Sequence, residues 1–142
     1  MAKQTLPVIA GVKAFIKKDN KFLIVKAHIN DDLYFWDLPG GKVDFGESPF
    51  DALRREVKEE VFLDVEIKEP LGIWWFFKEI DGGQVVCSTF LCIPTSTNID
   101  ITKNPGVDDI REFRWVTKQE FLTGDYKVSD ESLMRLIAEM KL

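Results

Sequence analysis

The sequence has few of the features that mark membrane, secreted or nucleic-acid-binding proteins. No apolar run approaches the about 18 residues that a membrane-spanning helix requires. Residues 1–11 lack the basic start and apolar stretch of a secretory signal, so we expect none. Binding to long nucleic acid needs a basic surface, whereas 24 acidic residues outnumber 19 basic ones and give a net charge of −5. A small anionic ligand stays compatible with this charge if a bound cation reverses it locally.

Cysteine is also scarce. Only Cys87 and Cys92 occur, five residues apart in a segment that is typical of a β-strand. Side chains at an odd separation on a strand point to opposite faces, so these two thiols should not form a disulfide with each other. We therefore expect two buried thiols in a reducing compartment, and a cytoplasmic protein.

The rest of the composition predicts one globular domain. The chain has 142 residues, of which 45% are hydrophobic and 12% aromatic, enough to build a core. Two helices separated by strands indicate the α+β class, with the helices flanking a mixed sheet. The expected elements are a hairpin over 6–27, a helix over 49–61, strands over 63–80 and 84–93 joined by a tight turn, a strand over 112–116, and a helix over 129–141 capped by Ser129.

Breaks are expected at two places within this order. Pro70 and Gly72 should interrupt the strand region over 63–80. The stretch 38–41 contains two glycines after a proline, so we expect an irregular turn there rather than a strand.

The first predicted helix has clear start signals. Ser48 is a good N-cap, Pro49 suits the first helical position, and Asp51 can answer the N–H of the cap. Its apolar residues recur at intervals of three and four, which predicts one buried stripe; they are Phe50, Leu53, Val57 and Val61.

The same helix carries clustered carboxylates. Glu56 faces both Glu59 and Glu60 at helical spacing, with Cβ atoms roughly 5–6 Å apart. Like charges so placed oppose helix formation, and the helix dipole disfavours anions near its C-terminal end. A divalent cation would reverse this penalty, because Mg²⁺ prefers oxygen ligands. The alternative is a solvated acidic face, which helices commonly have, and spacing alone does not exclude it.

The wider segment resembles the Nudix box, whose pattern is G-x5-E-x7-R-E-U-x-E-E-x-G-U, with U a bulky aliphatic residue. Eight positions match in register: Gly41, Glu47, Arg55, Glu56, Val57, Glu59, Glu60 and Leu63. One position departs, because Phe62 replaces the box glycine. A glycine readily takes the left-handed backbone conformation that often follows a helix, whereas phenylalanine takes it reluctantly. We therefore expect the chain to leave the helix by another route.

The resemblance implies an α/β/α sandwich, with a single Nudix hydrolase domain over 1–142. It also implies hydrolysis of a diphosphate linkage by a metal-activated water, with Mg²⁺ as cofactor and Mn²⁺ as a substitute. Glu56 and Glu60 would be the main metal ligands, Glu59 would assist or act as base, and the Gly41 carbonyl would complete the site. Glu47 would pair with Arg55 or join an outer metal shell, and Arg55 would hold the Glu59 carboxylate in place.

The base is not fixed by the box. Besides Glu59, the candidates are Glu112 and the neighbouring Asp108 and Asp109, because some family members recruit an acid from this region. The alternative for the two aspartates is a role as turn residues.

Substrate contacts are less specific. Lys42 could contact phosphates or be solvated, and Trp36 could stack on a base or pack in the core. In the run 74–77, Trp75 and Phe77 share one face and Trp74 and Phe76 the other. We expect one of these pairs in the core, and we expect Trp75 and Phe77 to line a cleft or pack under a helix.

The box predicts the type of reaction, but it does not identify the groups on either side of the diphosphate. A small nucleotide-like substrate is expected, either a nucleoside triphosphate or a nucleotide sugar. The rival hypotheses are a catalytically silent Nudix domain that senses a nucleotide or binds a partner, and a small interaction module with an acidic helix. The sequence is silent on oligomeric state, although homodimers are common in the family.

Overall fold

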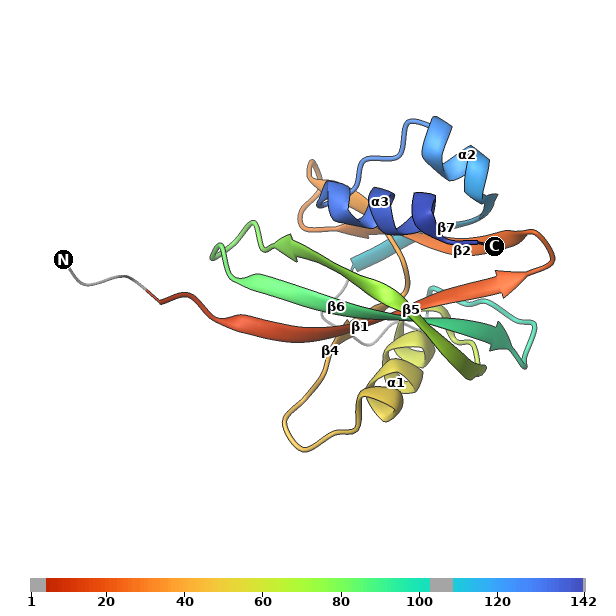
Figure 1. Cartoon of the computed structure of the whole chain (residues 1–142), viewed down its shortest axis with the longest axis horizontal. Coiled ribbons are helices and arrows are strands. Elements are labelled where there is room, and N and C mark those ends of the chain that lie inside the picture. The colour runs from red at the N-terminus through yellow and green to blue at the C-terminus, as the bar shows by residue number, and fades with distance from the viewer. Residues whose placement is uncertain (1–4, 103–108, 142) are drawn as a thin grey trace.

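The computed structural model describes residues 5–102 and 109–141. Along the described residues, one helix follows the first four strands and precedes the last three. The elements are β1 (Val8–Lys18), β2 (Lys21–His28), β3 (Tyr34–Asp37), β4 (Gly40–Lys42), α1 (Pro49–Val61), β5 (Val65–Phe77), β6 (Gln84–Pro94), β7 (Asp109–Thr117), α2 (Lys118–Thr123) and α3 (Glu131–Glu139). In Figure 1, α1 lies on one side of the central strands β1, β5 and β6, and α2 and α3 lie on the other. The predicted α+β class and the helix–sheet–helix layering are confirmed.

The sheet is mixed and has two halves. In the first half β1 pairs with β6 in parallel, β6 pairs with β5 antiparallel, and β4 pairs with β1. In the second half β2 lies between β3 and β7, with both pairs antiparallel. The halves join at the tip of β1 and β2, where only Lys17↔Phe22 and Lys18↔Lys21 are paired. The predicted hairpin over 6–27 is therefore wrong beyond its tip.

The reason for this separation lies in two continuous runs of buried residues, 11–16 in β1 and 22–25 in β2. Strands with both faces covered read as continuous apolar runs. Each run can then be buried by strands that are distant in sequence, and the Asp19-Asn20 turn fixes only the join.

Two core clusters occupy the two faces of the sheet. The cluster beneath α3 contains Trp74, Phe22 and Leu133, and the cluster beneath α1 contains Leu53, Val57 and Ile16 among others. Cys87 belongs to the first cluster and Cys92 to the second, which confirms that they point to opposite faces. Neither forms a disulfide, and burial raises the pKa of both thiols to about 12.

Helix α1 begins at Pro49 with Ser48 as its cap, as predicted. Ser48 accepts hydrogen bonds from the N–H groups of Phe50 and Asp51, with Pro49 in the first turn. The Asp51 carboxylate, however, accepts from Arg54 instead of answering the cap. Phe50 of the expected buried stripe is 46% exposed.

Phe62 corrects the expectation for the end of the helix. Phe62 takes the left-handed conformation that was expected to require the box glycine, with φ 61 and ψ 30, and its N–H donates to the Lys58 carbonyl. The Lys58 ammonium lies 4.4 Å from the centre of the Phe62 ring. A favourable cation–ring contact therefore offsets part of the backbone strain.

Three further expectations need correction. Strand β5 continues through Pro70 and Gly72, because shifts in its pairing with β6 absorb them at the edge of the sheet. The glycines of 38–41 begin a strand, β4, which pairs with β1. The final helix is capped by Asp130 rather than Ser129.

Helix α2 was not expected from the sequence. It begins with a capping box in which the side chains of Thr117 and Glu120 each bond to the other's backbone N–H. The T-x-x-E spacing that signals this motif is readable in the sequence.

Candidate metal centre

The buried glutamates of α1 face the glycines of β4. The Gly40 N–H donates to Glu60 Oε1 at 2.8 Å. A Cβ added to Gly41 would lie 2.5 Å from the carboxyl carbon of Glu56. This distance is too short for any real side chain, so the Glu56 carboxylate would have to move. Glu56 is only 9% exposed and Glu60 only 4%. The glycines therefore allow the strand backbone to approach two carboxylates closely.

Arg55 ties the carboxylates of the segment together. Its Nε and Nη2 donate to the two oxygens of Glu47 at 2.8 and 2.9 Å, a bidentate pair. Its Nη1 donates to Glu56 Oε1 at 2.9 Å and to Glu59 Oε2 at 3.4 Å. The side-chain hydrogen bonds from Arg55 hold the pKa of Glu47 at about 2. These bonds also raise the pKa of Arg55 above its usual value.

The donor set suits a hard divalent cation. Glu56, Glu59 and Glu60 offer carboxylate oxygens, and the Gly41 backbone lies against Glu56, a combination that fits Mg²⁺ or Mn²⁺. Within 5–102 and 109–141, however, no three acidic, histidine or cysteine side chains already form a metal cage. Arg55 instead bridges Glu56 and Glu59 and supplies the positive charge. Because no side chain separates the Gly41 backbone from the Glu56 carboxylate, the residues fit a cation that takes over part of this role.

One residue at this centre was missed from the sequence. Lys13 on β1 is 6% exposed, and its Nζ donates to Asp37 Oδ2 at 2.8 Å and to the Leu38 carbonyl at 3.5 Å. Burial alone would lower the pKa of Lys13, but the charges of Asp37 and Glu60 raise it above its usual value. The signal was a lone charge inside the apolar run 11–16.

The candidate base Glu112 lies in the other half of the sheet. On β7 it faces Lys26 of β2, and it accepts from Arg114 Nε at 2.7 Å. No described contact joins it to the glutamates of α1. Asp109 pairs with Arg111, whose hydrogen bond holds the pKa of Asp109 below its usual value. Asp108 lies outside the described residues.

The candidate substrate contacts are dispersed. Lys42 is exposed at the end of β4, and its carbonyl accepts from Arg55 Nη2 at 3.2 Å. Trp36 is 5% exposed and packs in the core, edge-on to Tyr126. Trp75 is half-buried and Phe77 is 52% exposed.

The aromatic run over 74–77 divides as its alternation predicts. Trp74 is buried and Phe76 packs against the same core cluster, so this pair is the core pair. Trp75 and Phe77 occupy the opposite face of β5.

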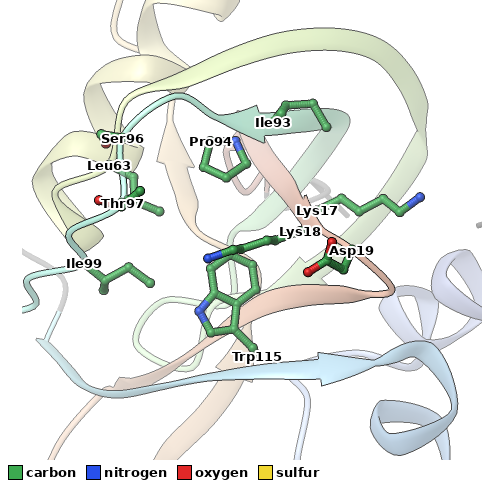
Figure 2. Close-up of a pocket in the computed structure, with 10 residues that line it drawn as sticks. All are labelled: Lys17, Lys18, Asp19, Leu63, Ile93, Pro94, Ser96, Thr97, Ile99 and Trp115. Carbon is green, nitrogen blue, oxygen red and sulfur yellow. The ribbon is translucent and has the colours of Figure 1, made fainter.

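Two adjoining cavities lie beyond the C-terminal end of α1. One, shown in Figure 2, has a volume of about 430 Å³, and in this view the Lys18 side chain extends between Trp115 and Pro94. The other has about 570 Å³, shares Trp115, and reaches Phe62. None of their lining residues is a candidate ligand or a candidate substrate contact, so these hollows are separate from the glutamate cluster.

A family model described as the NUDIX domain matches residues 7–137. The chain belongs to the NUDIX family. It is 32% identical to the nucleoside triphosphatase NudI of Salmonella arizonae over 85% of this chain and 90% of that protein. It is 36% identical to the ADP-ribose pyrophosphatase of Methanocaldococcus jannaschii, but the match covers 60% of this chain and only half of that enzyme.

The fold has close counterparts among solved structures. A MutT protein from Methanosarcina mazei superimposes with a TM-score of 0.78 over 96% of this chain and 94% of that one, at 22% identity. The predicted family and sandwich are confirmed, and the chain is a Nudix pyrophosphohydrolase. No helix within 5–102 and 109–141 is long and apolar enough to cross a membrane.

Proposed function

We propose that this protein hydrolyses a diphosphate linkage in a nucleoside triphosphate or a nucleotide sugar, using Mg²⁺, for which Mn²⁺ can substitute. Glu56, Glu60 and the Gly41 carbonyl hold the cation, and Glu59 assists or acts as base. The observation that carries the proposal is the burial of Glu56 and Glu60 against the glycines of β4. Buried carboxylates are costly unless a cation or hydrogen bonds compensate them, so clustering them at one strand favours cation binding over a solvated acidic face.

The protein's own groups have separate tasks in this proposal. Arg55, fixed by its bidentate bond to Glu47, orients the carboxylates of Glu56 and Glu59. When bound, the cation would polarise the phosphoryl oxygens and lower the pKa of the attacking water. Glu59 is half-buried at the rim of the cluster, where it can accept a proton. Lys42 is exposed beside the cluster and would contact a phosphate.

Among the base candidates, Glu59 is favoured over Glu112. The bond between Glu59 and Arg55 keeps Glu59 within the cluster, whereas Glu112 is held by Arg114 in the other half of the sheet.

The nucleobase of the substrate needs a ring on which to stack. Trp75 and Phe77 offer exposed ring surface, and the buried Trp36 offers little.

The substrate class is inferred from the relatives. NudI, which is named a nucleoside triphosphatase, aligns along most of both chains and favours a nucleoside triphosphate. The matched pyrophosphatase, which acts on ADP-ribose by its name, keeps nucleotide sugars in the proposal. We further propose that 1–142 is one Nudix hydrolase domain, and that its free, buried thiols belong in a reducing cytoplasm.

The proposal is tested with a panel of nucleoside triphosphates and nucleotide sugars. Release of phosphate, pyrophosphate and nucleoside monophosphate is followed with Mg²⁺ and with EDTA. Wild type is compared with Glu60→Gln and with Glu139→Gln, an exposed glutamate at the end of α3 that serves as the matched control. We expect Mg²⁺-dependent turnover of at least one compound, lost in Glu60→Gln and unchanged in Glu139→Gln.

Other outcomes would decide against it. A folded wild-type protein that binds a nucleotide but turns over no compound on the panel would be a sensing domain. Turnover that survives both EDTA and the Glu60→Gln substitution would show that hydrolysis does not depend on a metal ion held at this centre.

A further inference from the structure

Lys13 is a charged side chain buried in the middle of a strand, and neither the box pattern nor the proposed chemistry assigns it a role. In the sheet register it lies between Gly40 of β4 and Thr89 of β6. The side chains of Lys13 and Asp37 are 8% and 17% exposed, so their ion pair is largely shielded from water. A buried pair of this kind is weak evidence for stability alone, which leaves its placement to be explained.

The pair is attached to the turn that precedes β4. Asp37 Oδ2 accepts from Lys13, while its Oδ1 accepts from the Leu38 N–H at 2.7 Å. The Leu38 carbonyl also accepts from Lys13 Nζ, and the next carbonyl, of Pro39, accepts from the Ala14 N–H at 2.8 Å. Two neighbouring residues of β1 thus hold three successive residues of the turn.

The turn leads directly into the candidate metal centre. Gly40 follows it, and its N–H donates to Glu60. Gly40 has φ 150, and an added Cβ would lie 2.0 Å from the Val12 carbonyl, so the backbone here is pressed against β1. A shift of the turn would therefore move both the donor to Glu60 and the carbonyl of Gly41.

We propose that Lys13 is a positioning residue of the metal centre, which holds the turn over 37–40 so that Gly40 fixes Glu60 and the Gly41 backbone lies against Glu56. This inference rests on the proposed function. Lys13 donates to Asp37 and to the Leu38 carbonyl, and through them it acts on the backbone that leads to the ligands.

The charge of Lys13 makes the proposal testable. Glu60 is near enough to raise the pKa of Lys13, so the ammonium and a cation at Glu60 repel each other. Replacing Lys13 by a neutral residue would strengthen cation binding if its charge were all that mattered. Loss of positioning would instead weaken cation binding.

The experiment measures Mn²⁺ binding without substrate, by electron paramagnetic resonance of the free ion. The variants are Lys13→Met and Lys13→Met/Asp37→Asn; the double variant leaves the net charge unchanged and strands no buried carboxylate. The matched control is Lys118→Met, because Lys118 also donates to a main-chain carbonyl, that of Met140, on the far side of the sheet. Circular dichroism confirms that each protein is folded.

We expect the Kd for Mn²⁺ to be about 10–100-fold higher in the folded Lys13 variants than in wild type, the usual effect of removing a residue that orients metal ligands. Lys118→Met should bind within about twofold of wild type. Unchanged or tighter binding by the folded double variant would overturn the positioning role while leaving the proposed function intact. A wild-type protein that binds no Mn²⁺ would overturn the metal centre and the role of Lys13 together.

Discussion

Replacing Gly41 by alanine should separate catalysis from folding. The added Cβ would lie 2.5 Å from the Glu56 carboxyl carbon and 2.5 and 2.7 Å from its oxygens. Gly41 does not have a positive φ, so the change introduces crowding rather than backbone strain. The crowded atoms are the far end of a side chain, which can move by about 1 Å at a cost of about 1 kcal/mol, the low end for overpacking. For a domain of this size that lowers the Tm by about 3 °C.

The effect on turnover should be much larger. A displacement of about 1 Å in a group that fixes the reacting geometry can lower the rate about 100-fold. The assay is kcat/KM at saturating Mg²⁺, with thermal unfolding measured on the same samples. Gly83→Ala is the matched control, because its Cβ would lie 3.1 Å from Asp81 Oδ1, another carboxylate, in the turn between β5 and β6. We expect Gly83→Ala to retain turnover within about twofold. A Gly41→Ala enzyme with wild-type kcat/KM would refute the assignment of this site.

Two further predictions concern the ends of the box. Arg55 holds the pKa of Glu47 at about 2, below the ordinary 4.5, so this pair contributes stability above about pH 4.5 that is lost as the pH falls towards 2. Glu47→Gln should therefore flatten the decline of the urea midpoint between pH 4.5 and 2, and an unchanged slope would show that other carboxyls cause it. At Phe62, glycine removes the left-handed strain but also the Lys58 contact, so Phe62→Gly should change the free energy of unfolding by less than about 1 kcal/mol. Phe62→Val has neither advantage and should lose about 2 kcal/mol; equal denaturation midpoints for the two variants would contradict the strain argument.

Local signals predicted most of α1. The cap Ser48 and the first helical residue Pro49 act within one turn, so they were readable from neighbouring residues. The helical period identified the buried stripe except at Phe50, which is 46% exposed. The capping box of α2 was equally readable but was overlooked. At Phe62 a residue preference pointed the wrong way, because the rest of the helix end and the Lys58 contact outweigh it.

Pairings between distant residues were not readable in this way. The separation of β1 from β2 depends on β6 and β7, which come more than 50 residues later in the chain. The strand β4 exists only because β1 pairs with it, despite two glycines that disfavour strands in isolation. The spacing of Glu56 and Glu60 indicated a shared face, but their partners on β4 and the ion pair of Lys13 emerge only from the fold.

In the proposed function, Glu56, Glu60 and the Gly41 carbonyl hold the divalent cation on which hydrolysis depends. The most direct test is an anomalous difference map from crystals soaked in Mn²⁺ at a concentration that supports turnover. We predict a peak within about 2.5 Å of an oxygen of each of these three residues, the usual range for such ligands. A peak elsewhere, or none, in crystals of an enzyme that is active with Mn²⁺ would contradict the account.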